Sequence, residues 1–125
     1  MNIPANLKFS KEHEWLKVEG DLAIVGITDF AQSQLGDIVF VDIQTLGETL
    51  ERGEVFGAIE AVKTVADAFM PVSGTIEEVN ESLEDAPQTV NEDPYGKGWM
   101  VKIRLINPGE ISDLLDAQAY GDLIS

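Results

Sequence analysis

Short apolar and alternating stretches recur along the chain and are separated by turn residues. Residues 14–25 consist of two apolar stretches around Gly20-Asp21, a pair with hairpin turn chemistry. Residues 38–41 are apolar and β-branched or aromatic, residues 55–79 form a second strand-rich block, and residues 101–105 alternate apolar with charged side chains. This pattern predicts a mainly β chain with about six or seven short strands in a sandwich or barrel.

Helices are predicted at the margins of this β core. Thr28 is a suitable N-cap for a short helix in the N-terminal half, and Gly36 stands where that helix would end. We expect small helices in a C-terminal appendage at about residues 108–124. Residues 1–10 are expected to be a loosely tethered lead-in, and the polar, Pro- and Gly-containing residues 80–98 a long surface loop.

The composition is that of one compact globular domain. Of the 125 residues, 44% are hydrophobic and 25% are charged, and no apolar stretch is long enough to cross a bilayer. The start of the chain shows neither a secretory signal nor an Arg-rich import leader. We therefore expect a bacterial cytoplasmic protein, or a mitochondrial matrix protein in its processed form.

Acidic residues dominate the charge. Asp and Glu total 23 against 8 Lys and Arg, which gives a formal net charge of −15. Such a surface repels phosphate backbones and anionic membranes, so nucleic-acid and membrane partners are not expected. Solubility alone is a sufficient reason for the acidity, and steering toward basic surfaces of partner proteins is compatible with it.

The scarcity of reactive side chains argues against an enzyme. The chain has no Cys and only one His, His13, which excludes disulfides, thiolate nucleophiles and Cys/His metal sites. A Ser-His-acid triad would have to recruit His13, and no nucleophile elbow accompanies it. We therefore assign neither catalytic residues nor metal ligands.

Lys63 is the only basic residue between Arg52 and Lys97. Its β-branched neighbours Val62 and Thr64 favour a strand setting, in which a single lysine often prevents edge-to-edge pairing of sheets. A lysine that forms a Schiff base is the enzymatic alternative, but it needs a walled pocket that lowers its pKa. Because the chain is small and shows no evident phosphate cradle, the residues around Lys63 favour the edge-strand interpretation over the Schiff base.

Matches to one family follow the family's order along residues 9–104. They are His13-Glu14-Trp15, residues 26–32, residues 35–39, Glu60-Ala61-Val62-Lys63-Thr64, Pro71-Val72-Ser73-Gly74, Val79-Asn80, residues 91–96 and Gly98-Trp99. On these motifs the chain resembles the H proteins of the glycine cleavage system. The lysine motif of that family is usually written Glu-Ser-Val-Lys, so Ala61 is a mild departure.

The resemblance implies a flattened β-barrel of the lipoyl-domain (barrel-sandwich hybrid) type, with a single domain over residues 1–125 and a lipoyl-like core at about 20–104. It places Lys63 at the tip of a protruding hairpin as N6-lipoyllysine, with covalent lipoic acid as the cofactor and Glu60, Val62 and Thr64 as hairpin neighbours. Local turn chemistry does not predict this tip, because residues 62–65 contain no Gly, Asn or Asp.

A non-catalytic carrier is the function that the resemblance implies. It would take an aminomethyl group from glycine decarboxylase, a pyridoxal-phosphate enzyme, and present it to the aminomethyltransferase. Dihydrolipoyl dehydrogenase would then reoxidise the arm. A lipoate ligase or a lipoyl or octanoyl transferase would attach the lipoyl group.

Glu14 and Asp67 occupy motif positions whose acids, in H proteins, line a cleft that receives the loaded arm. Their role would be charge-assisted hydrogen bonding to a cationic amine, although most acids among the 23 are expected to be solvated surface. Glu12 stands where some relatives carry a small hydroxyl residue, so its contribution to the cleft is open. His13 is given no catalytic role, and Trp15 and Trp99 are expected in the core.

Other families of lysine-bearing modules differ from this chain in their motifs. Biotinyl domains normally carry Met on both sides of the modified lysine, where this chain has Val62 and Thr64. Lipoyl domains of 2-oxo acid dehydrogenases lack the His13-Glu14-Trp15 element. Two functional alternatives stay open: a lipoyl relay that donates lipoyl groups to 2-oxo acid dehydrogenases, and an unmodified acidic interaction domain.

Overall fold

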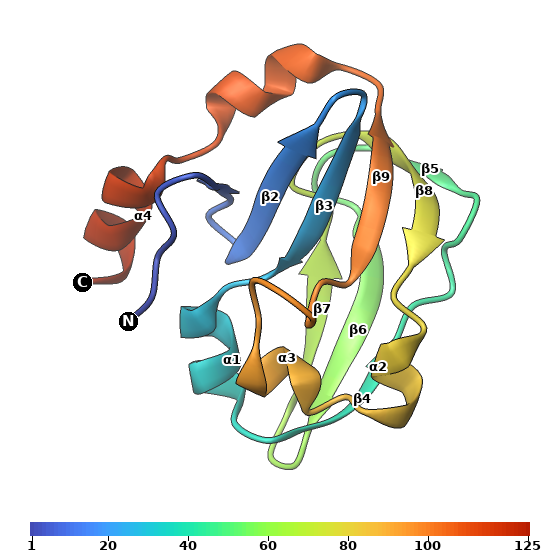
Figure 1. Cartoon of the computed structure of the whole chain (residues 1–125), viewed down its shortest axis with the longest axis vertical. Coiled ribbons are helices and arrows are strands. Elements are labelled where there is room, and N and C mark those ends of the chain that lie inside the picture. The colour runs from blue at the N-terminus through green and yellow to red at the C-terminus, as the bar shows by residue number, and fades with distance from the viewer.

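Two antiparallel sheets enclose the core in the computed structural model, which describes residues 1–125 (Figure 1). The larger sheet has the strand order β1-β2-β3-β9-β8-β5, and the smaller one has the order β4-β6-β7. The strands are β1 (Lys8–Phe9), β2 (Glu14–Glu19), β3 (Leu22–Ile27), β4 (Ile38–Asp42), β5 (Thr49–Leu50), β6 (Val55–Ala61), β7 (Val65–Phe69), β8 (Gly74–Val79) and β9 (Val101–Leu105). The helices are α1 (Asp29–Leu35), α2 (Ser82–Asp85), α3 (Thr89–Glu92), the 3₁₀ helix η1 (Pro108–Asp113) and α4 (Ala117–Ile124).

The core lies between the two sheets and contains 18 buried residues. Val25 of β3 and Ile103 of β9 contribute from the larger sheet, and Phe56 and Ile59 of β6 from the smaller one. Alternate side chains of a strand point to opposite faces, so each strand covers one side of this core. The predicted mainly β barrel-sandwich architecture is confirmed, with nine short strands rather than six or seven.

The hairpin and the first helix form where the sequence predicts them. Strands β2 and β3 pair from Glu14 opposite Ile27 to Glu19 opposite Leu22, and Gly20 in the turn has φ +66°. The Thr28 hydroxyl accepts a hydrogen bond from the Ala31 amide of α1 at 3.1 Å. That contact satisfies one of the free N–H groups at the helix start, as an N-cap does.

The prediction of a loose N-terminal lead-in is wrong. Strand β1 pairs with β2, and Phe9 bridges to Leu115 near the C-terminus. Leu7 and Phe9 are buried in a second cluster with Trp15 and Tyr120. The local sequence could not predict this strand, because its partners lie in other segments of the chain.

The prediction of a structureless loop over residues 80–98 is wrong in part. The segment contains α2 and α3, which bury Leu83 and Val90 respectively. The Asn80 amide donates hydrogen bonds to the carbonyls of Lys97 and Trp99, so the two ends of the segment lie together. Trp99 itself is half-buried against the second cluster.

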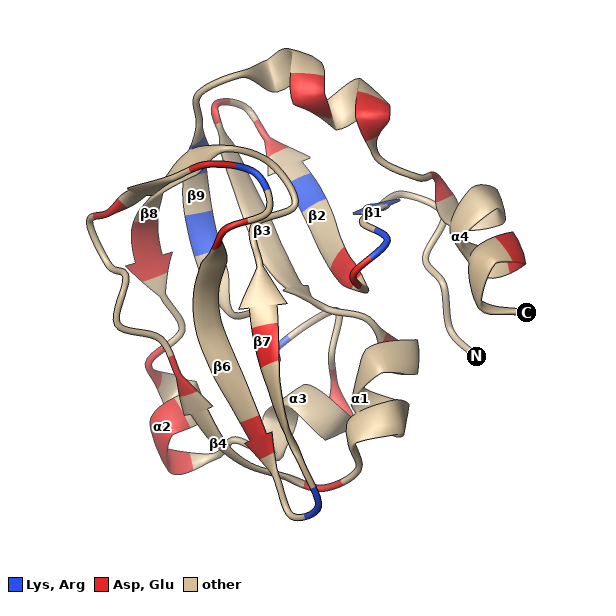
Figure 2. Cartoon of the chain, turned by 180° about the vertical axis from the view of Figure 1, so that it is seen from behind, with Lys and Arg blue, Asp and Glu red and all other residues tan.

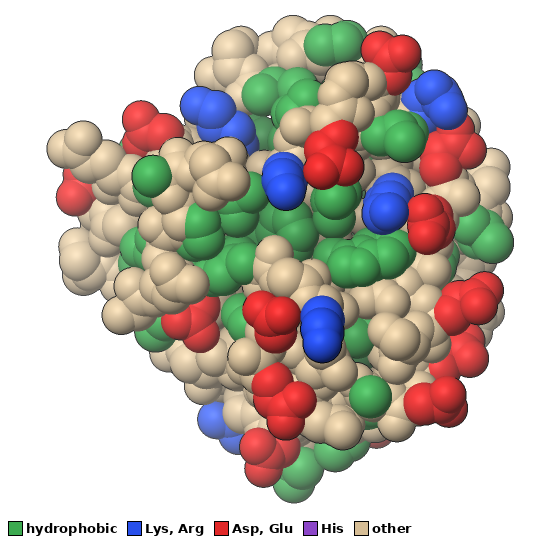
Figure 3. Space-filling model, viewed as in Figure 1, with side chains coloured by type: hydrophobic (Ala, Val, Ile, Leu, Met, Phe, Trp, Pro, Cys, Tyr) green, Lys and Arg blue, Asp and Glu red, His purple; other side chains and the backbone are tan.

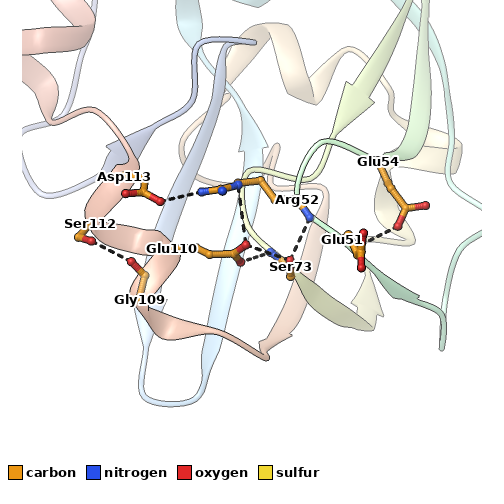
Figure 4. A network of polar contacts seen from close by, with 8 residues as sticks. All are labelled: Glu51, Arg52, Glu54, Ser73, Gly109, Glu110, Ser112 and Asp113. Carbon is orange, nitrogen blue, oxygen red and sulfur yellow. Dashed lines mark hydrogen bonds and ion pairs between the residues drawn. The ribbon is translucent and has the colours of Figure 1, made fainter.

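Polar contacts hold the C-terminal segment against the barrel (Figure 4). Arg52, between β5 and β6, donates to Asp113 at 2.8 Å, and its guanidinium lies 3.7 Å from Glu110. Glu110 in turn accepts from the Ser73 amide at 2.8 Å. From there the chain passes beyond the ends of β2 and β3 to α4, which lies beside the N-terminus (Figure 1). No helix of the chain combines the length and the apolar character needed to span a membrane.

Candidate functional site

Lys63 lies at the tip of the hairpin formed by β6 and β7, which projects from the smaller sheet with one basic residue at its end (Figure 2). The Ala61 amide donates to the Thr64 carbonyl at 2.8 Å, which leaves Val62 and Lys63 as the tip. Neither tip residue has a positive φ. The turn therefore needs no Gly, Asn or Asp, which is why turn chemistry gave no sign of it.

The loop after α1 packs against this tip and is hydrogen-bonded to it. The Val62 amide donates to the Asp37 carbonyl at 3.0 Å, and a Cβ placed on Gly36 would lie 3.5 Å from the Lys63 Cε. The Asn91 side chain donates to the Gly36 carbonyl and accepts from the Ile38 amide, at 2.8 and 2.9 Å. These contacts hold the lysine at a defined place on a rigid support.

The amine of Lys63 is available for chemistry. The ion pairs of the protein use Lys17, Arg52, Lys102 and Arg104, and none uses Lys63. Its neighbours Val62 and Val65 are 76% and 62% exposed, and Glu60 and Thr64 are exposed as well. Exposed apolar side chains around a free amine are typical of a surface that another protein contacts.

A cleft of about 350 Å³ lies between α1 and the base of the hairpin. Its lining includes Glu12, Glu14 and Asp67, so the structure brings the two predicted acids together and adds Glu12. Apolar side chains of β3, α1, β6 and β7 form much of the remaining wall, among them Phe30 and Ile59. Lys63 lies outside this lining, at the far end of the strand that carries Asp67.

Glu14 is the most unusual carboxylate of the protein, because only 1% of it is exposed. The Ser10 hydroxyl donates to its Oε1 at 2.5 Å, and the Phe69 amide of β7 donates to its Oε2 at 3.2 Å. Burial raises the pKa of Glu14 to about 7, with a further contribution from the charge of Glu12, although both hydrogen bonds act in the opposite direction. A carboxyl group with this pKa changes its charge readily near neutral pH.

Ser10 was not predicted as a site residue. Its hydroxyl also accepts a hydrogen bond from the Glu14 amide at 3.0 Å. Glu12, whose contribution to the cleft was left open, is exposed, and the hydroxyl that bonds to Glu14 comes from Ser10 two residues earlier. The turn over residues 10–13, which brings Ser10 back to Glu14, is not visible in the sequence.

His13 also lines the cleft. Its φ of +73° makes it the one residue other than glycine with a positive φ. Its Nδ1 lies 2.8 Å from the hydroxyl of Tyr120, which lies 2.7 Å from the hydroxyl of Thr28. Burial lowers the pKa of His13, and the charge of Glu12 opposes that shift. Sequence reasoning missed Tyr120, which is 107 positions away from its partner.

A second cavity of about 360 Å³ lies on the other side of Glu14. It is lined by N-terminal residues, the start of the β5–β6 loop and the segment before α4. Neither Lys63 nor Asp67 borders it. No group of three or more His, Cys, Asp or Glu side chains is arranged to hold a metal ion.

Known proteins resemble this chain over nearly its whole length. The family model described as glycine cleavage H-protein matches residues 7–125. The glycine cleavage system H protein of Bacteroides thetaiotaomicron is 59% identical over 125 residues, covering 100% of this chain and 99% of that protein. The H protein of Chlorobium limicola is also 59% identical, over 126 residues, covering 99% and 98%. The crystal structure of an H protein from Mycobacterium marinum superposes with a TM-score of 0.88 at 39% identity, covering 96% of this chain and 97% of that one.

Proposed function

Because the chain belongs to the glycine cleavage H-protein family, we propose that Lys63 carries its lipoyl group and that Glu14 and Asp67 receive the loaded arm. The protein is a non-catalytic, lipoylated carrier of the glycine cleavage system. The lipoyl group would supply a disulfide that opens to two sulfurs, one of which can hold the aminomethyl group of glycine and which as a dithiol carry electrons.

Lys63 is assigned as the attachment point because its amine is exposed, rigidly supported and without a carboxylate partner. Joining the lipoyl carboxyl to Nζ forms an amide and removes the positive charge of the lysine. We assign Glu60, Val62 and Thr64 to recognition by the lipoate ligase or the lipoyl or octanoyl transferase. All three are exposed and lie within three residues of the amine.

The distance from the tip to the cleft suits an arm on Lys63. Asp67 lies four positions after Lys63, and four steps along an extended strand span about 13 Å. About a dozen bonds join the Cα of a lipoylated lysine to its dithiolane, which at roughly 1.2 Å per bond of an extended chain reaches about 14 Å. An arm folded back along β7 would therefore end at the cleft.

Glu14 and Asp67 are suited to hold a cationic amine. Asp67 lies exposed on β7, and Glu14 lies buried in the cleft with both oxygens already hydrogen-bonded. A cation beside Glu14 favours the ionised carboxylate, so docking of an amine would release the proton that burial retains. The apolar walls, including Phe30 and Ile59, would exclude water from the docked group.

The protein interacts with the enzymes of the glycine cleavage system. We assign three such partners: the pyridoxal-phosphate glycine decarboxylase, the aminomethyltransferase and dihydrolipoyl dehydrogenase. The net charge of −15 favours basic docking surfaces on them. On the face shown in Figure 3, Lys and Arg side chains gather mainly over the upper half, and Asp and Glu side chains outnumber them over the lower half. We place the protein in a bacterial cytoplasm.

Intact-mass measurement tests the attachment point. Protein produced in a host that makes lipoate should gain one lipoyl group, and Lys63→Arg should gain none. Lys97→Arg, which removes another exposed lysine, is the matched control and should be modified like the wild type. An unmodified wild-type protein, or a modified Lys63→Arg variant, would refute the assignment.

The double variant Glu14→Ala, Asp67→Ala tests the cleft. We expect lipoylation to stay intact, because neither residue lies at the tip, and the loaded arm to release formaldehyde and ammonia faster. The single variant Glu12→Ala shows whether the third acid of the cleft takes part. Decay of the loaded double variant at the wild-type rate would exclude this role for the two acids.

A further inference from the structure

One wall of the cleft depends on an unusual turn at His13. Adjacent residues of a regular strand point to opposite faces, yet Glu12, His13 and Glu14 all line the same cleft. The positive φ of His13 changes the direction of the chain at this point. Such a conformation is unfavourable for a residue with a side chain and persists where neighbouring contacts hold it.

The contacts that hold His13 come from distant parts of the chain. Its carbonyl accepts from the Thr28 amide at 3.0 Å, and its ring lies 5.0 Å from that of Phe30. Its Nδ1 is hydrogen-bonded to Tyr120 of α4 at 2.8 Å. Tyr120 is fully buried and stacks on Phe9 at 4.7 Å between ring centroids, so its hydroxyl has a fixed position.

The direction of these hydrogen bonds follows from the buried Thr28. Its hydroxyl oxygen accepts from the Ala31 amide, and its proton has one other partner within reach, the oxygen of Tyr120. Buried hydroxyl protons are rarely left unpaired. Thr28 therefore donates to Tyr120, Tyr120 donates to His13 Nδ1, and the ring proton of a neutral His13 resides on Nε2.

We propose that Tyr120 is a positioning residue for the cleft: through its hydroxyl, helix α4 holds His13 in the backbone conformation and tautomer that place Glu14 in the cleft wall. The inference rests on the proposed function of the cleft as the resting place of the arm. It gives the C-terminal helix, which lies outside the two sheets, a part in the carrier function. A neutral imidazole here also leaves Glu14 and Asp67 free to bind a cation.

Tyr120→Phe removes the hydroxyl and keeps the ring that stacks on Phe9. Tyr95→Phe is the matched control, because the Tyr95 hydroxyl bonds to the Asp29 amide and the Asn2 carbonyl and does not contact His13. His13 is the only histidine of the chain, so its ring signals in ¹⁵N-edited NMR are unambiguous. Lipoylation is checked by intact mass in each protein.

We expect the unmodified wild type and Tyr95→Phe to show the Nε2–H tautomer of His13, and Tyr120→Phe to show a mixture of tautomers. After lipoylation and loading, Tyr120→Phe should lose the aminomethyl group about three- to tenfold faster, the factor that one neutral hydrogen bond corresponds to. Tyr95→Phe should decay at the wild-type rate.

An unchanged tautomer and an unchanged decay in Tyr120→Phe would overturn the inference, as would equal acceleration in both tyrosine variants. If Tyr120→Phe does not fold, the unmodified wild type still decides: the Nε2–H tautomer of His13 supports the inference, and the Nδ1–H tautomer overturns it. Failure to lipoylate Lys63 would instead count against the proposed function, whereas the tautomer of the unmodified protein tests the Tyr120 contact independently.

Discussion

Replacing Glu14 by Gln should change how the stability of the protein depends on pH. The pKa of Glu14 lies above its value in the unfolded chain because the folded protein buries the carboxyl group. Between pH 4.5 and about 7, the folded state therefore holds a proton that the unfolded state has lost. The contribution of Glu14 to stability is fully present below pH 4.5 and is lost as the pH rises to about 7.

The magnitude follows from the two pKa values. A rise from 4.5 to about 7 corresponds to about 3 kcal/mol of unfolding free energy, at 1.36 kcal/mol per pH unit. Gln does not ionise, so the variant lacks this dependence. Its amide group also presents a donor to the Phe69 amide or to Ser10, which makes the variant about 1–3 kcal/mol less stable than the wild type with a protonated Glu14.

Urea denaturation of the unmodified proteins at pH 5, 6, 7 and 8 measures this effect. Glu14→Gln should be less stable than the wild type at pH 5 and equal or more stable at pH 8. The other 22 acids are present in both proteins, so their contributions drop out when the two unfolding free energies are subtracted. The test is how this difference changes with pH. Asp122→Asn, which removes an exposed charge on α4, is the control and should run parallel to the wild type. Parallel curves for Glu14→Gln would refute the reasoning.

Three further substitutions test the supports of the site. Gly26→Ala should lower the unfolding free energy in urea by about 1–3 kcal/mol, because its Cβ would lie 2.7–2.9 Å from ring atoms of Trp15; an unchanged midpoint would contradict the packing. Asn91→Ala should lower the unfolding free energy by about 1–3 kcal/mol, because it leaves backbone groups of the loop after α1 unpaired. Backbone amides of that loop should then exchange faster with solvent hydrogen. Val62→Ala should leave the thermal midpoint unchanged, because the side chain is 76% exposed, and should slow lipoylation of Lys63 several-fold; an unchanged rate of modification would remove Val62 from the recognition surface.

Elements specified by neighbouring residues could be predicted from the sequence. The hairpin around Gly20 and the capped helix that begins after Thr28 have the residue ranges that their turn and cap chemistry indicates. The alternating residues 101–105 form β9 with Val101 and Ile103 buried. In each case the signal lies within a few residues, so no distant partner was needed to recognise it.

Elements that depend on distant partners could not be predicted in this way. Strand β1 exists because it pairs with β2 and touches Leu115. The tip at Val62 and Lys63 has no turn residues of its own, since its φ values are negative and the Asp37 carbonyl supports it. The position of Lys63 at the tip came only from the family resemblance.

By itself, the sequence determined a mainly β, acidic chain without reactive cysteine, and through distributed motifs it singled out Lys63, Glu14 and Asp67. Only the tertiary structure decided that Glu14 is buried and bonded to Ser10, and that Tyr120 is hydrogen-bonded to His13 in the lining of the same cleft. The reason is physical. Composition and periodicity report what a residue and its near neighbours favour. The desolvation of a carboxyl group and a hydrogen bond across 107 positions exist only once the chain has folded.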